Sequence, residues 1–312
     1  MSDILDTKRL NAQLAGRIKA VARKRGVAAI LVRKQYVFTL FLSRMFGTEE
    51  RPPWVLLGGN ALLIRAGGGR FTEDIDLARE SPWGDLDGVR KELQALADQN
   101  PERDPFRFEI YAIDAHSEAD PFGYGTKTAK ARVRATLDGV VFDTFTIDIT
   151  SRRHLDGPVD DIPLAPIIDH ETLNDLPAVP TTPAENHLAD KVCAMYEPHG
   201  EDKNPSTRYR DLADIVRLIA VADIDAERLH RVLVREKQRR KIDLPEAMVS
   251  PGDIWSDQFP RAARDFAEYP SDLYSLEASL NTAGTCLNPI LAGEVTSGIW
   301  RASDATWTPS PA

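Results

Sequence analysis

The chain has 312 residues, of which 42% are hydrophobic and 28% charged, a composition typical of a globular protein with one large or two modest domains. Its net charge of −9 argues against a protein whose whole surface binds nucleic acid, although a local basic groove remains compatible with it. The sequence has no apolar run of about 18 residues and no signal-like start, so we expect no membrane span and a cytoplasmic location. Cys193 and Cys286 form neither a disulfide framework nor a metal-ligand pattern.

Hydrophobic spacing in the first half of the chain predicts both helices and strands. The Asp138-Gly139 pair between two alternating runs predicts a hairpin. Because the strands do not alternate regularly with helices, the pattern favours an α+β unit with a mixed sheet over a doubly wound fold. The predicted helices lie near 7–25, 29–46, 61–65 and 85–98, and the predicted strands near 54–57, 74–78, 106–113, 129–137 and 140–150.

The second half is predicted to be mostly helical. Residues 156–183 are rich in proline and acid and show no period, which is typical of a linker. Thr182, Pro183 and Glu185 predict a helix start, with Thr182 as the N-cap. Helical segments are expected to continue from about 206 to 291, and residues 301–312 are expected to form a loose tail. We therefore predict a first domain over 1–155 with N-terminal helices, a linker over 156–183 and a helical domain over 184–312.

Two acidic residues on one predicted strand give the strongest chemical signal. Asp74 and Asp76 are two residues apart, so their side chains project from the same side of the strand and repel each other unless a cation lies between them. Mg²⁺ bound by carboxylates and substrate phosphates is the usual solution, with Mn²⁺ as the alternative ion. Gly58 and Gly59 stand where a strand gives way to a helix, and the backbone N–H groups there favour a triphosphate. A solvated acid pair is the competing interpretation.

Asp148 is the candidate third carboxylate. It lies on the polar side of an alternating strand, where an acid is costly unless it is paired or bound to a metal. Three such carboxylates can hold two metal ions and stabilise the attacking and leaving oxygens of an in-line displacement. A solvated strand face or a structural ion pair would explain Asp148 equally.

The helical half contains further candidate residues. Lys191 lies towards the apolar stripe of its predicted helix, which suits either a cation that meets a phosphate or a lysine that snorkels to the rim. Arg208 and Asp211 are i, i+3 partners on the next helix, a spacing that a surface salt bridge also explains. Seven basic residues between 228 and 241 form either a solvated face or a surface for backbone phosphates.

Taken together, four segments resemble the AbiEii/AbiGii-type nucleotidyltransferase toxins, including the mycobacterial MenT-like toxins. The segments are VLLGGNALLIR, RFTEDIDL, ADKVCAMY and RYRDLADI, in the family's order, and the resemblance covers roughly residues 54–216. It implies a DNA-polymerase-β-like nucleotidyltransferase head with a mixed sheet, a mostly helical C-terminal domain, Mg²⁺ chemistry and a cognate antitoxin partner. By motif position it places Gly58, Gly59 and Asn60 on the phosphate loop, Asp74 and Asp76 on the metal pair, and Lys191 and Asp211 on two positions needed for activity.

The resemblance also implies a substrate. Some MenT-like members add pyrimidine nucleotides to the 3′ end of tRNA and so block aminoacylation, which makes CTP or UTP and the tRNA acceptor end the expected substrates, in a toxin-antitoxin or phage-defence setting. Asn60 stands where many members have Ser or Thr, and its amide can donate a hydrogen bond to phosphate.

These inferences combine into one mechanistic hypothesis. Carboxylates hold the metal, a phosphate loop binds the triphosphate, and cations neutralise its charge. Two alternatives stay open. One is a module that binds NTP and inhibits by contact. The other transfers a nucleotide to a protein hydroxyl or a small molecule, or a phosphate to a partner or to itself, for which the Thr72 hydroxyl is a candidate. In this hypothesis Asp74, Asp76 and Asp148 bind the metal, and Asp148 also helps remove the proton from the RNA 3′-hydroxyl. Gly58, Gly59 and Asn60 bind the phosphates. Lys191, with Arg65 or Arg208, neutralises the charge of the triphosphate, and Asp211 orients Lys191 or Arg208.

Overall fold

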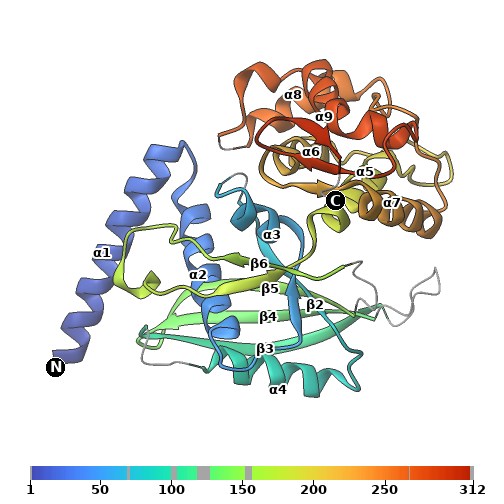
Figure 1. Ribbon diagram of the computed structural model, residues 1–312. Helices are drawn as coiled ribbons and strands as arrows, with labels where there is room; N and C mark the ends of the chain where they lie inside the picture. Colours follow the sequence, from blue (N-terminus) through green and yellow to red (C-terminus); the bar gives the residue numbers. More distant parts are fainter. Residues whose placement is uncertain are drawn as a thin grey trace. The chain divides into compact units, whose positions relative to one another are not determined.

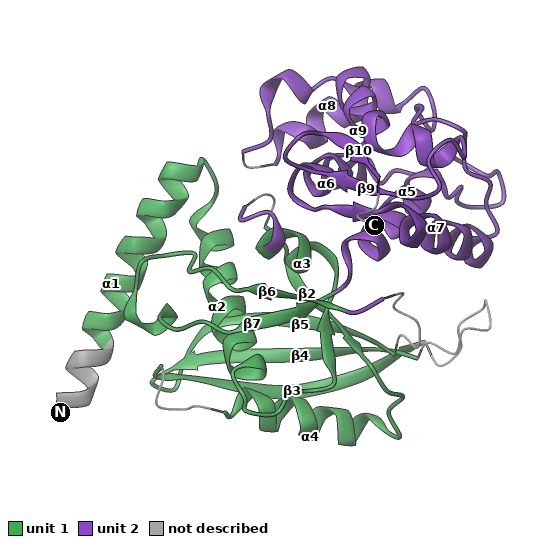
Figure 2. Ribbon diagram, in the orientation of Figure 1, with its two compact units in different colours: residues 1–64, 71–154, 159–181 green, residues 65–70, 155–158, 182–312 purple. Residues whose placement is uncertain are grey.

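The computed structural model describes residues 2–68, 71–99, 104–117, 127–151, 157–266 and 268–309, with only the backbone of residues 2–7. The chain divides into two compact units, which Figure 2 colours separately. Unit 1 comprises residues 1–64, 71–154 and 159–181, and unit 2 comprises residues 65–70, 155–158 and 182–312. The predicted domain end at residue 155 lies outside the described residues.

The described residues of unit 1 form a seven-stranded mixed sheet with strand order β3-β4-β5-β2-β1-β7-β6 (Figure 1). The β2–β5 and β1–β7 pairs are parallel and the other neighbours antiparallel, which confirms the expected α+β class with a mixed sheet. The strands are β1 (Trp54–Leu56), β2 (Asp74–Arg79), β3 (Phe106–Ser117), β4 (Thr128–Leu137), β5 (Val140–Ser151), β6 (Asp160–Pro163) and β7 (Ala178–Thr181).

The hairpin between β4 and β5 forms where the Asp-Gly pair predicts it. Asp138 and Gly139 have φ values of 50° and 73°, and such left-handed conformations at both central residues suit the right-handed twist of the flanking strands. Further along the pair, a register shift between Ala135 and Thr136 inserts one extra residue into β5. This bulge decides which β4 residue lies opposite Asp148.

Apolar residues gather on one face of the sheet, where α2 (Ala29–Phe46) and α4 (Leu86–Ala97) complete the core. Edge-to-face aromatic contacts join Phe41 of α2 to Phe108 and Phe145, at centroid distances of 5.4 and 5.5 Å. The opposite face of the central strands carries the polar side chains, so the alternation that builds the core also gathers the candidate carboxylates.

The N-terminal helix α1 (Ser2–Arg25) lies beside α2 (Figure 1). In the described part of the chain no single helix has the length and apolar character needed to cross a membrane; only the bent pair formed by residues 8–25 and 29–46 meets that test, and only by length and composition.

The prediction of a linker without regular structure over 156–183 is wrong, because the described part of this segment contains two strands. Strand β7 pairs in parallel with β1 at Leu56 and Thr181, and β6 pairs antiparallel with β7, with a short 3₁₀ turn (Glu171–Leu173) between them. These strands extend the sheet by long-range pairing, which leaves no periodic signature in a short proline-containing segment.

Unit 2 is mostly helical, as expected. It contains α5 (Ala184–Tyr196), α6 (Tyr209–Val221), α7 (Ala226–Arg240), α8 (Trp255–Arg264) and α9 (Leu276–Leu291). The loose-tail expectation is wrong for its described part, because β9 (Ile299–Arg301) and β10 (Thr306–Thr308) pair with each other and β9 pairs with β8 (Ile224–Asp225). Trp300 of β9 is buried and its Nε1 donates to the Ile219 carbonyl at 2.8 Å, which anchors this strand.

The start of α5 also differs from the prediction. Pro183 occupies the N-cap position, and the Thr182 hydroxyl is buried without a hydrogen-bond partner among the described residues, so Thr182 does not cap the helix. The Glu185 carboxylate accepts from the Asp225 backbone N–H at 2.9 Å instead of reaching back to the helix start. A tertiary contact has therefore replaced the local capping pattern.

Candidate active site

Three carboxylates lie on neighbouring parallel strands of unit 1. In the β2–β5 register Asp76 is paired with Asp148 and Asp74 with Thr146, while the intervening Ile75 and Ile147 are buried in the core. Alternation along both strands therefore places Asp74, Asp76 and Asp148 on the polar face. The structure brings together the three residues that the sequence predicts as metal ligands.

Lys130 of β4 joins this group from the other side of β5. It lies opposite Asp148, its Nζ is 2.9 Å from Asp148 Oδ1, and both side chains are 39% exposed. The hydrogen bond to Asp148, with the charges of Asp148, Asp74 and Asp76, raises the pKa of Lys130 although burial opposes the shift. Lys130 was not among the predicted site residues, because its only signal in the sequence is a lysine on the polar side of an alternating strand.

The carboxylate cluster carries excess negative charge. Burial and then the charge of Asp148 raise the pKa of Asp74, and Lys130 offsets this only in part. In the described residues no three or more His, Cys, Asp or Glu side chains converge closely enough to hold a metal by themselves. Mg²⁺ commonly takes one or two carboxylates and completes its shell with water and substrate phosphates. The oxygen-only donors and the raised pKa of Asp74 therefore fit a hard divalent cation that shares its shell with a substrate.

The Asp76 side chain packs directly against Gly58, the first residue of α3 (Gly58–Arg65). A Cβ on Gly58 would lie 1.9 Å from Asp76 Oδ2, and Gly58 has a φ of +61°, so both space and backbone conformation require glycine there. The Leu57 N–H donates to the Asp76 carbonyl at 2.9 Å. These contacts place the start of α3, where the first backbone N–H groups have no partner inside the helix, beside Asp76.

Asn60 and Thr72 support the backbone of Asp74. Asn60 Nδ2 and Thr72 Oγ1 donate to the Asp74 carbonyl at 2.7 and 3.1 Å, and both residues are buried. One N–H of the Asn60 amide is used within the protein and the side chain is fully buried, so the candidate phosphate donor at this position is its backbone N–H. Gly59, the other predicted phosphate-loop residue, lies in the first turn of α3.

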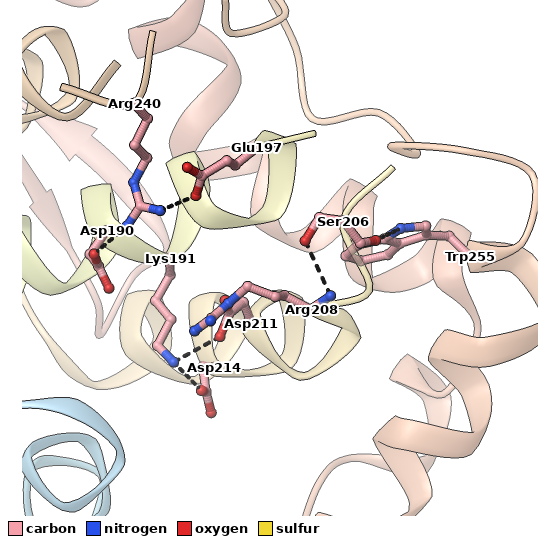
Figure 3. A network of polar contacts seen from close by, with 9 residues as sticks. All are labelled: Asp190, Lys191, Glu197, Ser206, Arg208, Asp211, Asp214, Arg240 and Trp255. Atoms are coloured by element: carbon pink, nitrogen blue, oxygen red, sulfur yellow. Dashed lines mark hydrogen bonds and ion pairs between the residues drawn. The ribbon is translucent and has the colours of Figure 1, made fainter. Parts of the chain in front are cut away.

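Unit 2 contains a buried charge network (Figure 3). Lys191 Nζ of α5 lies 2.9 Å from Asp211 Oδ1 and 2.6 Å from Asp214 Oδ2, and all three side chains are almost fully buried. Burial lowers the pKa of Lys191, but the two carboxylates outweigh it and raise the pKa overall. Arg208 Nε, on a half-exposed side chain, contacts Asp211 Oδ2 at 2.6 Å. The predicted Lys191, Arg208 and Asp211 thus lie in one network.

Two further residues of this region were not among the predicted site residues. Asp214 lies one turn after Asp211, a spacing visible in the sequence, and only this spacing could have linked it to Lys191. His187, one turn before Lys191, is buried, and neither of its ring nitrogens has a hydrogen-bond partner in the described residues. Burial, reinforced by the charge of Lys191, lowers the pKa of His187 to about 3. Arg65, predicted to contact nucleotide, donates from one terminal nitrogen to the Thr182 carbonyl at 2.9 Å.

The basic segment on α7 is largely paired within unit 2. Arg228 contacts Glu185 at 3.4 Å, Lys237 contacts Asp243 at 3.1 Å, and Arg239 contacts Glu236 at 2.7 Å. Arg240 bonds both Asp190 and Glu197, as Figure 3 shows. These ion pairs favour the interpretation of the segment as a structural helix face over a phosphate-binding surface.

Comparison with known proteins identifies the family. No curated protein matches the sequence. MenT4, a nucleotidyltransferase toxin from Mycobacterium tuberculosis, is similar in structure at 22% identity, with 70% of this chain and 68% of that chain covered and a TM-score of 0.46. JHP933 from Helicobacter pylori is similar at 14% identity, with coverage of 86% and 94% and a TM-score of 0.46. The model of the family described as nucleotidyl transferase AbiEii toxin, type IV TA system, matches residues 40–283, a span that contains every candidate residue above. The chain therefore belongs to the AbiEii family of nucleotidyltransferase toxins.

Proposed function

We propose that this toxin transfers a nucleoside monophosphate from an NTP, with CTP or UTP favoured, to the 3′ end of tRNA in a Mg²⁺-dependent reaction, and so blocks translation in the cytoplasm. The observation that carries the proposal is the in-register Asp76–Asp148 pair beside Asp74, with the glycine start of α3 packed against Asp76. Family membership supports the transfer of a nucleotide and an antitoxin partner. The tRNA acceptor and the pyrimidine preference rest on the resemblance to MenT-like toxins.

The proposed roles in unit 1 follow from the side-chain contacts. Asp74 and Asp76 would hold the metal, which would supply positive charge against the triphosphate and the leaving pyrophosphate. Asp148 accepts the proton of the RNA 3′-hydroxyl as its oxygen bonds to the α-phosphorus and the bond to pyrophosphate breaks. Lys130 holds Asp148 in orientation through the 2.9 Å contact. The backbone N–H groups of Gly58, Gly59 and Asn60 bind phosphate oxygens, as helix N-termini commonly do.

We extend the proposal to the fold of unit 1 as a DNA-polymerase-β-like head. It is supported by three features: a strand followed at once by a glycine-initiated helix, the paired acids on the neighbouring strand β2, and the third acid on the adjacent parallel strand β5.

In unit 2 we propose that Lys191 and Asp211 act by holding Arg208. Lys191 is already compensated by Asp211 and Asp214, so its charge is not available to a substrate in this arrangement. Asp211 instead divides its two oxygens between Lys191 and Arg208, which fixes the half-exposed guanidinium. Arg208 is then the cation of this network that can meet a phosphate.

A transfer assay tests the proposal directly. Purified protein is incubated with Mg²⁺, total tRNA and each labelled NTP in turn, and the RNA is resolved on a gel. Asp74→Ala should abolish labelling. Asp114→Ala is the matched control, because Asp114 is also a strand acid paired across the sheet, at 2.7 Å with Arg132. Label on tRNA from one or two NTPs, lost only in Asp74→Ala, supports the proposal.

Other outcomes separate the alternatives. Label on protein instead of RNA would favour a protein-modifying module, and NTP binding without any transfer would favour an inhibitory binder. Thr72 is a poor acceptor for self-modification as it stands, since it is buried and its hydroxyl donates to the Asp74 carbonyl.

A further inference from the structure

A pocket of about 470 Å³ lies within unit 2, between the start of α6 and one side of α8. This volume falls in the range of small-ligand sites, about 300–1,000 Å³. Three arginines line the pocket, against two aspartates, one of which is the buried Asp211. The charged lining residues are Arg208, Arg210, Asp211, Arg261 and Asp265.

The wall of the pocket is held rigidly. Trp255, fully buried at the start of α8, donates from Nε1 to the Ser206 carbonyl at 2.8 Å, and Ser206 Oγ accepts from the Arg208 backbone N–H at 3.2 Å (Figure 3). The Tyr209 ring packs edge-on against Trp255 with centroids 4.9 Å apart. Together with the Arg208–Asp211 ion pair, these contacts fix the backbone and one guanidinium of the pocket before any ligand arrives.

Two of the pocket arginines have no partner among the described residues. The side chains of Arg210 and Arg261 are exposed, and neither makes a hydrogen bond or ion pair with any residue that the structure describes. The α7 arginines Arg228, Arg239 and Arg240 behave differently, since each is paired with an acid. In a protein of net charge −9, uncompensated cations around one pocket point to an anionic ligand.

The position of the arginines on α6 strengthens this argument. Arg208 is the N-cap and Arg210 lies in the first turn, at the end of a helix where the macrodipole is positive and cations are unfavourable. Asp211 is the acid of that turn, and Lys191 and Arg208 already share it. An anion in the pocket would neutralise the charge of the arginines and also interact favourably with the positive end of the helix. Guanidinium groups bind phosphate in a bidentate manner.

We propose that this pocket is a subsite for a backbone phosphate of the RNA substrate, bound by Arg210 and Arg261 and by the fixed guanidinium of Arg208. The identity of the polyanion as RNA rests on the proposed function. The pocket itself contains none of the carboxylates assigned to metal binding, so its contribution is to RNA affinity and placement.

Binding without turnover tests the proposal. Wild-type protein is titrated into a labelled tRNA acceptor-stem hairpin in the absence of NTP and metal, and fluorescence anisotropy is followed across a salt series. Arg210→Gln and Arg261→Gln should each weaken RNA binding roughly three- to tenfold. Each should also reduce the slope of log K against log salt by roughly 0.7–0.9, the value of one lost phosphate contact. Arg264→Gln is the matched control, since Arg264 is an exposed arginine one turn later on α8 that stacks on Tyr274 outside the pocket.

The same variants are tested for CTP and UTP affinity, which should not change. A drop in nucleotide affinity without a drop in RNA affinity would assign the phosphate to the triphosphate and overturn the proposal. Equal losses in all three variants, an unchanged salt slope in the Arg210/Arg261 double variant, or no RNA binding by wild type would overturn it too. Wild type that binds RNA through these arginines but transfers no nucleotide would refute the proposed function and leave this subsite standing.

Discussion

Gly58→Ala isolates the contact between the phosphate-loop glycine and the predicted metal ligand Asp76. The added Cβ would lie 1.9 Å from Asp76 Oδ2 and 2.7 Å from its Cγ. Since non-bonded carbon and oxygen need about 3.4 Å, the carboxylate or the start of α3 must move by roughly 1.5 Å. A misplacement of about 1 Å at a reacting centre can cost on the order of 100-fold in rate, so we expect transfer to fall at least that far.

Backbone strain has to be separated from this displacement. Alanine at the φ of +61° of Gly58 costs about 1–2 kcal/mol whatever surrounds it. Gly67→Ala supplies the matched control, because Gly67 has a φ of +64° and an added Cβ there would meet nothing within 4 Å. Both variants should lose a few degrees in thermal midpoint, roughly 2–4 °C for each kcal/mol. Only Gly58→Ala should lose transfer.

The assay is the initial rate of labelled-NMP transfer to tRNA over a Mg²⁺ titration, with a thermal melt of each variant. Gly58→Ala should show a lower maximal rate than Gly67→Ala and need more Mg²⁺ for its half-maximal rate, because the displaced carboxylate is a proposed metal ligand. A Gly58→Ala protein that melts like Gly67→Ala and transfers at the wild-type rate would refute the assignment of Asp76.

Three further predictions concern charge. Without metal, Asp74→Asn should raise the thermal midpoint by about 1–3 °C, since it removes a carboxylate whose pKa burial and Asp148 already raise, and it should abolish stabilisation by Mg²⁺; a lower midpoint with retained Mg²⁺ stabilisation would contradict this. Lys191→Met leaves Asp211 and Asp214 buried without their lysine and should lower the free energy of unfolding in urea by about 3–5 kcal/mol. Arg208→Gln, at a side chain 52% exposed, should lower it by under about 1 kcal/mol. Equal losses would show that the network is not centred on Lys191. His187→Leu should reduce the loss of unfolding free energy at acid pH. Below the ordinary His pKa of 6.5 the unfolded chain binds a proton that the folded chain, with a His187 pKa of about 3, does not bind, so wild type should lose up to about 1.4 kcal/mol per pH unit as pH falls between these two values. A variant whose stability falls as steeply as that of wild type would show that other groups set the slope.

Local sequence patterns predicted many of the helices, strands and turns of unit 1. The α2 helix begins and ends where its apolar spacing predicts, and the β4–β5 turn forms at Asp138-Gly139 because that pair tolerates left-handed backbone. The carboxylates of β2 share a face because strand alternation leaves no other choice once Ile75 enters the core. Four short motifs in order were enough to indicate the family.

Unit 2 shows where local patterns mislead. The Thr182–Pro183–Glu185 pattern predicts a capped helix, but Glu185 bonds to the backbone of Asp225, forty residues later, and the helix begins after Pro183. The density of basic residues on α7 is compatible with either a solvated face or a phosphate surface, but Arg228, Lys237 and Arg240 form ion pairs with acids outside the helix. Composition cannot reveal which charges find partners, because the partners are distant in sequence.

The sequence by itself determined which residues are candidates for the site: paired acids on a strand, a glycine-initiated helix, and a lysine and an aspartate on successive helices. Tertiary structure alone decided their neighbours. The bulge in β5, opposite Ala135 and Thr136, shifts the β4–β5 register by one residue and brings Lys130 opposite Asp148, where an unbroken hairpin would have set it opposite Ile147. Likewise, β7 joins the sheet beside β1 from a segment with no period of its own. Pairings of this kind depend on the free energy of the whole sheet, which cannot be inferred from any short segment of the sequence.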